Sequence, residues 1–459
     1  MTSTSIGHST ICAISTPYGC GGIAIVRVCG NNAISIVDTI FKGRKLLTTA
    51  QPYTIQYGEI VKSHTDQDGK THHEILDQVL VSIFRAPHSF TGEDTIEIAC
   101  HGSIYIQQTL LQWLVEKGCQ LAKPGEFTQR AFLNGKLDLT EAEAVADLIA
   151  AQTKAEKDLA LTQLRGGISN QLAQLRDRLL TFTSLIELEL DFADHEELEF
   201  ANRDQLYQLA NEIYTTIHKL VQSFQTGNAI KHGIPVAIIG APNVGKSTLL
   251  NALIGEDRAI VSDIQGTTRD TIEDTLIING ILFRFIDTAG MRQTDDTIEN
   301  LGIQRSIKAA ERATIIIHLQ DASQPINILK DLHELQDKHI IHVFNKADLI
   351  TAQQHTEKAI YISAKSGEVN ELICQLSLFA AEKTNTNNSV TISNTRHYEA
   401  LIRAQEAILR VQQGLDQQIS GEFLSMDLQD CLNALGEITG QISSQEVLNN
   451  IFSKFCIGK

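Results

Sequence analysis

The segment that most constrains the fold of this chain is glycine-rich and eight residues long, G-A-P-N-V-G-K-S at positions 240–247. A short apolar run at 236–239 precedes it, and residues 248–253 have the character of a helix. A G-x-x-x-x-G-K-S pattern between a strand and a helix is typical of a loop whose backbone N–H groups surround phosphates. In this interpretation Lys246 contacts the β- and γ-phosphates and the hydroxyl of Ser247 binds Mg²⁺.

The sequence around this loop alternates between two kinds of segment. Short β-branched runs occur at 236–239, 283–286, 315–318, 340–344 and 360–363, with helical stretches between them. Such alternation is the mark of a doubly wound α/β sheet. We therefore predict a Ras-like P-loop domain over residues 232–382.

Three further motifs follow predicted strands of this domain. Asp348 of N-K-A-D can accept from the N1–H and 2-amino groups of guanine, which adenine does not offer, and S-A-K at 363–365 is placed as a second base-contacting loop. D-T-A-G at 287–290 is placed to sense the γ-phosphate. Together the four motifs predict a GTPase. Its predicted GTP-binding residues are Asn243, Val244, Gly245, Lys246, Ser247, Thr248, Asp287, Thr288, Ala289, Gly290, Asn345, Lys346, Asp348, Ser363 and Ala364.

The residue after D-T-A-G raises the question of how water is oriented. Ras-like GTPases carry glutamine there, whereas this chain has Met291, which offers no useful hydrogen bond. Another polar group must orient the attacking water, and the sequence alone does not show which one. The nearby candidates are Gln293, Asp295, Asp296 and Glu299, with Arg269 and Arg292 as conceivable arginine fingers.

Helical stretches flank the α/β domain on both sides. Leu172, Leu175, Leu179, Phe182 and Ile186 repeat at helical spacing, and the same spacing resumes after a polar segment at 384–389. The simplest explanation is one discontinuous helical domain with the α/β domain inserted into it. The predicted parts are 1–134 (an α+β domain), 135–231 (helical), 232–382 (the inserted domain) and 383–459 (helical).

Composition restricts partners and location. The 459 residues carry a formal charge of −17, which argues against binding nucleic acid through net charge alone. None of the eight cysteines forms a C-x-x-C pair, and no apolar run approaches the roughly 18 residues of a membrane span. The first ten residues lack the basic region of a signal peptide. We expect a cytoplasmic protein that does not enter a membrane.

Motifs over nearly the whole chain resemble those of one family. They are T-P-x-G-x-G-G-I-A-I-V-R at 16–27, S-F-T-G-E-D at 89–94, K-P-G-E-F-T at 123–128, R-A-F-L-N-G-K-L-D-L at 130–139, G-T-T-R-D at 266–270 and C-I-G-K at 456–459. In these the chain resembles the MnmE (TrmE) family of tRNA-modification GTPases, within the TrmE-Era-EngA-like potassium-dependent class.

The resemblance implies a potassium-activated GTPase without an arginine finger. It assigns K⁺ binding to Asn243, Ser262, Ile264 and Thr267, and Mg²⁺ binding to Thr268 beside Ser247, so that Ser262, Thr267 and Thr268 join the GTP-binding set. It assigns orientation of the water to Glu299. It also implies that the amino-terminal domain binds a tetrahydrofolate derivative through Arg27, Glu97, Lys136 and Lys459. The thiol of Cys456 is either a member of the modification centre or a structural thiol.

The resemblance also implies partners. Members form homodimers through the amino-terminal domain, and with the flavoprotein MnmG they install an aminomethyl or carboxymethylaminomethyl group at carbon five of the wobble uridine in certain tRNAs. Contact with tRNA is then expected mainly through the partner. Two alternatives remain open at this point. One is a ribosome-assembly GTPase that acts as an RNA-binding switch, and the other is a folate-dependent transferase that uses the nucleotide only structurally.

Overall fold

A computed structural model of the chain describes residues 9–65, 71–191, 203–255, 274–286, 309–325, 338–350, 359–384 and 390–458. Backbone contacts divide it into two compact units. The first combines Met1–Ala146, Gln163–Ala173 and Leu435–Lys459, and the second combines Asp147–Thr162 and Gln174–Ala434. The three domains and their boundaries at 134, 231 and 382 stay predictions.

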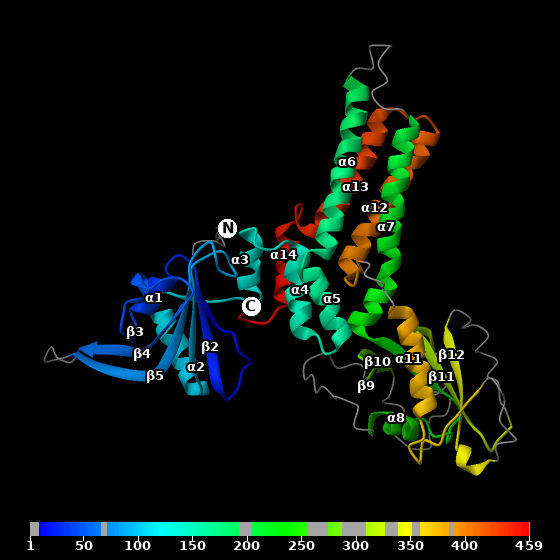
Figure 1. The fold of residues 1–459 in the computed structure, drawn as a ribbon, viewed down its shortest axis with the longest axis horizontal. Helices are drawn as coiled ribbons and strands as arrows, with labels where there is room; N and C mark the ends of the chain where they lie inside the picture. The colour runs from blue at the N-terminus through cyan, green and yellow to red at the C-terminus, as the bar shows by residue number, and fades with distance from the viewer. Residues whose placement is uncertain are drawn as a thin grey trace. The chain divides into compact units, whose positions relative to one another are not determined.

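The first unit is built around a seven-stranded sheet (Figure 1). All neighbouring strands are antiparallel except β1 and β7, which are parallel. Trp113 and Leu110 of α2 (Ile104–Glu116) and Val37 of α1 (Ala33–Asp38) pack in the core on this sheet. The strand order is β3 (Phe41–Gly43), β4 (Thr54–Thr65), β5 (Thr71–Phe84), β6 (Thr95–Gly102), β2 (Gly21–Cys29), β1 (Ile11–Ile14) and β7 (Gln120–Leu121).

Helices from both ends of the chain complete the first unit. α3 (Glu126–Leu133) contacts α14 (Gln445–Ser453). Leu139 at the start of α4 (Leu139–Ala150) shares a core cluster with Phe452. Segments about 300 residues apart therefore bury one another's apolar side chains, as a discontinuous helical domain requires.

Long helices form a bundle in the second unit (Figure 1). α7 (Arg203–His232) runs along α12 (Thr395–Asp416), beside α6 (Gly167–Asp191) and α13 (Gly421–Thr439). The residues with repeated helical spacing on α6 and α12 are buried, which confirms the predicted seams. A short helix, α5 (Lys154–Leu164), precedes α6. Within the described residues, no helix is both long and apolar enough to cross a bilayer.

A six-stranded sheet forms the rest of the second unit. Its order is β13 (Ile360–Tyr361), β12 (His339–Asn345), β11 (Ile315–Asp321), β8 (Ile234–Ile239), β10 (Ile281–Phe285) and β9 (Asp274–Ile278). All pairs are parallel except β9 with β10, so the predicted doubly wound sheet is confirmed. α8 (Lys246–Gly255) follows β8, and α11 (Asn370–Thr384) follows β13.

The edge strand β9 was not predicted from the sequence. It joins β10 through Asn279 and Gly280, whose φ angles of 50° and 81° are those of a tight hairpin turn. The Asn-Gly pair is a hairpin signal in the sequence itself, so this strand could have been foreseen. The last predicted strand is shorter than expected, since β13 ends at Tyr361 and Ser363 forms only an isolated bridge with Glu368.

Candidate functional site

The phosphate-binding loop joins β8 to α8, as its pattern predicts. Asn243 and Gly245 have φ angles of 63° and 97°, and left-handed residues in such a loop turn backbone N–H groups toward one concave side. The Lys246 Nζ donates to the carbonyls of Gly240 and Ala241, at 2.9 Å each. Burial lowers the pKa of Lys246 below its ordinary value. The lysine is thereby held over the loop, where it can exchange these carbonyls for phosphate oxygens.

Asn345 ties the phosphate loop to both base-contacting loops. Its Nδ2 donates to the Val244 carbonyl at 2.8 Å, and its Oδ1 accepts from the Ala364 N–H at 3.0 Å. A Cβ added to Gly245 would overlap the Asn345 amide. Glycine is therefore required at this position by space as well as by φ. Three of the four motifs form one hydrogen-bonded assembly.

Asp348 is exposed beside the second base-contacting loop. Its Oδ1 accepts from the Ser363 hydroxyl at 2.8 Å, and the Ala347 N–H donates to the Ile362 carbonyl at 3.0 Å. Since Ser363 is buried, it fixes the direction of the carboxylate. The geometry fits recognition of a base that offers two donors side by side, as guanine does.

Several predicted residues lie outside the described part of the chain, and their roles stay predictions. They are Ser262, Ile264, Thr267 and Thr268 of the switch loop, Asp287, Thr288, Ala289 and Gly290, the water candidates including Glu299, and Lys459. Ser247 and Thr248 are the second and third residues of helix α8, directly after Lys246, where the pattern places them.

A second polar site lies in the first unit. Arg27 of β2 faces Glu97 of β6 in the sheet register, and its Nε and Nη2 both donate to Glu97 Oε1, at 3.0 and 2.8 Å. The guanidinium also lies 5.5 Å from the ring centroid of Phe127 on α3. Its Nη1 donates to the Gly458 carbonyl at 3.4 Å, and Ser15 Oγ donates to the same oxygen at 3.2 Å. The carboxyl-terminal segment therefore forms part of this site.

The structure also describes Lys136, which was predicted to bind folate, and Cys456, which was predicted for the modification centre or as a structural thiol. Lys136 is exposed, and its stem lies beside the turn at Gly92. Cys456 is exposed, and its carbonyl accepts from the Gly125 N–H at 3.4 Å. The structure thus brings together Arg27, Glu97 and the carboxyl-terminal segment.

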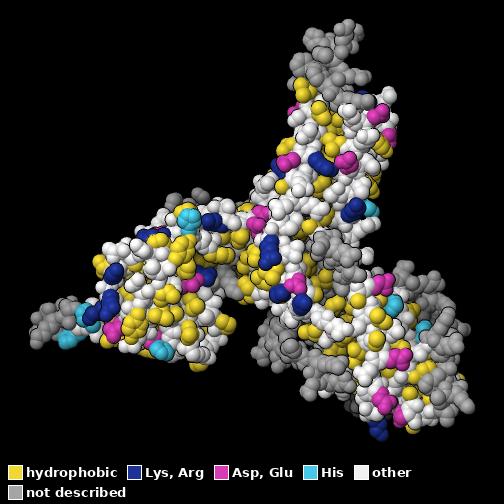
Figure 2. All heavy atoms as spheres, in the orientation of Figure 1, with side chains coloured by type: hydrophobic (Ala, Val, Ile, Leu, Met, Phe, Trp, Pro, Cys, Tyr) yellow, Lys and Arg dark blue, Asp and Glu magenta, His cyan; other side chains and the backbone are white. Residues whose placement is uncertain are grey.

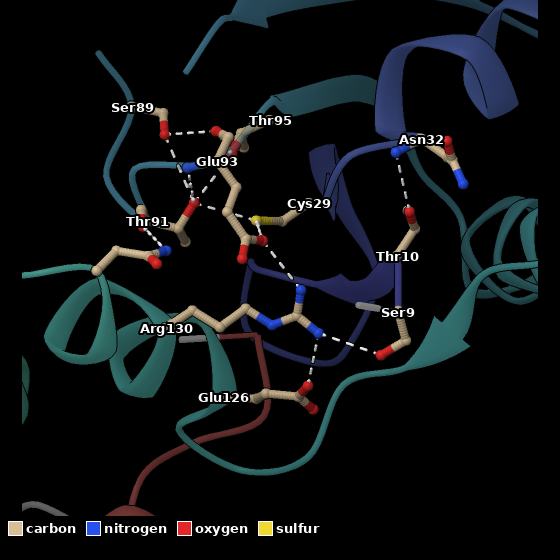
Figure 3. Close-up of polar contacts among 11 residues, drawn as sticks. Ser9, Thr10, Cys29, Asn32, Ser89, Thr91, Glu93, Thr95, Glu126 and Arg130 are labelled. Carbon is tan, nitrogen blue, oxygen red and sulfur yellow. Dashed lines mark hydrogen bonds and ion pairs between the residues drawn. The ribbon is translucent and has the colours of Figure 1, made fainter. Parts of the chain in front are cut away.

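The same unit contains a buried ion cluster centred on Arg130 (Figure 3). Arg130 is only 1% exposed, and its Nη1 and Nη2 donate to Glu93 Oε2 and Glu126 Oε1, at 3.0 and 2.9 Å. Cys29 Sγ donates to Glu93 Oε2 at 3.3 Å, and burial raises the pKa of this thiol to about 11. Glu126 Oε2 accepts from the Lys123 N–H at 2.8 Å. The cluster therefore fixes the turn whose Gly125 contacts the carboxyl-terminal segment.

Sequence reasoning named these charged residues only as members of motifs. Glu93, Glu126 and Arg130 come from the three separate motifs at 89–94, 123–128 and 130–139. One signal was available, because Arg130 directly precedes the apolar run Ala131-Phe132-Leu133. It could not identify the two carboxylates that share the arginine.

Comparison with known proteins supports the same conclusion as the motifs. The profile of the MnmE helical domain matches residues 139–456, and that of the GTP-binding protein TrmE N-terminus matches residues 10–136. The tRNA modification GTPase MnmE of Parabacteroides distasonis is 52% identical, over 98% of this chain and 100% of that protein. The proteins of the same description from Bacteroides thetaiotaomicron and Flavobacterium johnsoniae are 51% and 47% identical, each over 99% of this chain and 100% of the relative.

Solved structures give a weaker likeness. The G domain of the T. maritima FeoB iron transporter is 25% identical and covers 33% of this chain and 99% of its own, with a TM-score of 0.23. That score is too low to support the fold. The sequence relatives cover the full chain, and they confirm the GTPase predicted from the four motifs. The chain belongs to the MnmE family of tRNA modification GTPases.

Proposed function

We propose that this GTPase modifies tRNA together with the flavoprotein MnmG, adding an aminomethyl or carboxymethylaminomethyl group at carbon five of the wobble uridine. A tetrahydrofolate one-carbon unit supplies the added carbon. The observation that carries the proposal is the second polar site, where Arg27, Glu97 and the Gly458 carbonyl converge far in sequence from the nucleotide loops. A GTPase that only switched partners would not need this site.

The chemistry of the second site fits a folate. A carboxylate such as Glu97 accepts hydrogen bonds from the donor edge of a pterin, and guanidinium or ammonium groups pair with the carboxylates of the folate tail. Arg27 holds Glu97 Oε1 with two hydrogen bonds and so fixes its direction. In this proposal Lys136 and Lys459 contribute positive charge, and Cys456 contributes a thiol to the modification centre.

The nucleotide site would use metal ions during hydrolysis. Ser247 and Thr268 would hold Mg²⁺, and Asn243 with Ser262, Ile264 and Thr267 would hold K⁺. These ions would neutralise negative charge on the phosphates. Asn243 is exposed at the turn of the phosphate loop with a left-handed backbone, a position from which its amide can reach an ion beside the phosphates. Glu299 would orient the attacking water.

A second copy of the chain would cover the face of the amino-terminal sheet that carries the folate site. The cross-strand pairs Ile55–Ser82 and Ser82–Glu97 place Ile55 on the same face as Glu97 and Arg27. Tyr57 and Leu80 form a neighbouring pair, and both are largely exposed. Hydrophobic side chains gather over this part of the molecule in the space-filling view (Figure 2). An apolar face of this kind favours a homodimer.

The charge of the chain bears on how tRNA is bound. A chain with a net charge of −17 repels the phosphates of tRNA at long range. In the proposed complex the flavoprotein therefore supplies most of the basic surface that docks the tRNA.

Nucleoside analysis of tRNA tests the proposal. A strain without this protein should lack the wobble-uridine modification, and the wild-type gene should restore it. Arg27→Met should fail to restore it while GTP turnover persists, whereas the exposed Arg44→Met should restore it as a matched control. Normal modification in the deletion strain would refute the proposal. Crosslinking to ribosomal RNA without the flavoprotein would instead favour a ribosome-assembly role.

Turnover with different monovalent cations tests the potassium part separately. GTP hydrolysis in KCl should collapse in NaCl at equal ionic strength, with and without the flavoprotein. Equal rates in the two salts would refute a potassium site while leaving the role in tRNA modification open to the nucleoside analysis.

A further inference from the structure

A buried acid at the end of β11 belongs to none of the four nucleotide motifs. Asp321 is the last residue of this strand and is 6% exposed. It lies opposite Asn345 in the sheet register, and the Ala322 N–H donates to the Asn345 carbonyl at 2.9 Å. A buried carboxylate is costly unless charged or polar groups compensate it. Its partners therefore indicate what it does.

Asp321 is held by one charged and two neutral donors. Its Oδ2 lies 2.6 Å from Lys346 Nζ. Its Oδ1 accepts from the Ser323 N–H at 3.0 Å and from the Ser323 hydroxyl at 2.7 Å. Burial alone would raise the pKa of Asp321, but the bonds from Lys346 and Ser323 outweigh it and lower the pKa below its ordinary value. The carboxylate is therefore charged at neutral pH and fixed in one orientation.

Lys346 carries this constraint to the phosphate loop. Its Nζ also donates to the Asn243 carbonyl, at 3.1 Å. Lys346 and Asn243 have φ angles of 64° and 63°, a left-handed conformation that is uncommon for residues with a Cβ, more so for lysine than for asparagine, and that surrounding contacts can stabilise. The contacts from Asp321 to Lys346 and from Lys346 to the Asn243 carbonyl stabilise this backbone conformation. It also joins the guanine loop to the phosphate loop at a second point besides Asn345.

We propose that Asp321 is a positioning residue for nucleotide binding, whose charge holds the Lys346 ammonium on the Asn243 carbonyl. The phosphate loop is then fixed relative to the guanine loop before GTP binds. Prior ordering of this kind lowers the cost of binding and leaves the chemical step unchanged. If Asn243 holds K⁺, the same contact also orders the potassium site, and that extension rests on the proposed function.

Substitution of the acid tests the proposal in the full-length protein. Asp321→Asn keeps the volume but removes the charge, so KM for GTP at saturating KCl should rise about tenfold, the usual effect of losing a charged hydrogen bond. The kcat should stay within about twofold. Ser323→Ala leaves the ion pair intact and should change KM by no more than about twofold. Thermal unfolding is measured for each variant.

A double-mutant cycle shows whether Asp321 acts through Lys346. Lys346→Met should raise KM at least as much as Asp321→Asn, and the double variant should show no further rise. Three results would overturn the proposal: a lowered Tm with unchanged KM, a fall in kcat at constant KM, or additive effects in the double variant. If Asp321→Asn does not fold, an unchanged KM in Lys346→Met would overturn it. All these KM values are measured in KCl, whereas the potassium site is tested by comparing wild-type turnover in KCl and NaCl. Failure of one proposal can therefore be distinguished from failure of the other.

Discussion

At the nucleotide loops the contacts run between neighbouring loops of one sheet, whereas at the amino-terminal site they run between the two ends of the chain. Asn345 reaches Val244 and Ala364, which lie in loops that follow two other strands of the same sheet, β8 and β13. Arg27 instead reaches Gly458, 431 positions later in the sequence. The nucleotide site forms where loops at the ends of strands of one sheet meet. The amino-terminal site forms only when segments from the two ends of the chain have come together in the first unit.

The two sites also differ in how their charges are compensated. Lys246 rests on two backbone carbonyls, which an incoming phosphate can replace without leaving a buried charge. Arg130, whose side chain is 2% exposed, is instead shared by two carboxylates that are 14% and 10% exposed, so losing the arginine would leave two largely buried charges. The nucleotide site is therefore built to exchange partners, and the ion cluster is built to hold the carboxyl-terminal segment in place.

The largest effect should come from breaking the ion cluster. Arg130→Met leaves Glu93 and Glu126 buried without a counter-charge, and removing one partner of such a group costs about 3–5 kcal/mol. The free energy of unfolding of the first unit, measured by denaturant titration, should fall by that amount. Arg178→Met breaks an exposed ion pair with Glu212 in the second unit, and should lower the free energy of unfolding of that unit by less than about 1 kcal/mol. Equal losses in the two variants would mean that the ion cluster stabilises its unit no more than an exposed ion pair does.

A methyl group in the phosphate loop should give the next largest effect. Gly245→Ala forces a Cβ against the Asn345 amide at a φ of 97°, so the loop must open and GTP affinity should fall about 100-fold. Binding of a fluorescent GTP analogue measures this. Gly255→Ala, where a Cβ meets nothing within 4 Å, should bind as the wild type does. An unchanged affinity in Gly245→Ala would show that the loop yields without cost.

The sequence predicted where the nucleotide loops lie in the fold but not which residues meet at the dispersed site, for a physical reason. The residues Gly245, Lys246 and Asp348 sit in short motifs whose spacing alone determines the chemistry, and the structure places them as predicted. The contact between Arg27 and Gly458 depends on which helix faces pack together, which spacing does not specify. Resemblance to a family assigned folate binding to Arg27 and included Gly458 only as part of the C-I-G-K motif, so it did not indicate their contact. The sharing of Arg130 by two carboxylates was missed for the same reason, as were the contacts of Asp321, which ends strand β11 and belongs to no motif.

A methyl group at the other end of the chain should act on the amino-terminal site alone. Gly458 has a φ of 94°, and a Cβ there would overlap the Ile14 carbonyl. In Gly458→Ala the carboxyl-terminal segment should leave the site, so carboxypeptidase should release the last residues about tenfold faster. Gly118→Ala has a similar φ of 103° but open space around its Cβ, and should be digested like the wild type. A loss of GTP affinity in Gly458→Ala would contradict the independence of the two sites.

The smallest effect concerns pH and should be confined to the nucleotide-binding unit. Burial and the neighbouring His342 lower the pKa of His318 to about 4, whereas an unfolded histidine titrates near pH 6.5. Below pH 6.5 the unfolded chain therefore takes up a proton that the folded chain refuses, and stability falls with falling pH. Between pH 7 and 5.5 this loss should be about 1 kcal/mol.

His318→Leu removes the titrating group from the buried surface of β11 and should flatten this part of the pH profile of unfolding. A profile in His318→Leu parallel to that of the wild type would mean that the neutral histidine is not what makes this sheet sensitive to acid. A flattened profile would show that the sheet of the nucleotide site, like the ion cluster of the first unit, contains a buried group that does not tolerate a change in charge, although the cost is smaller.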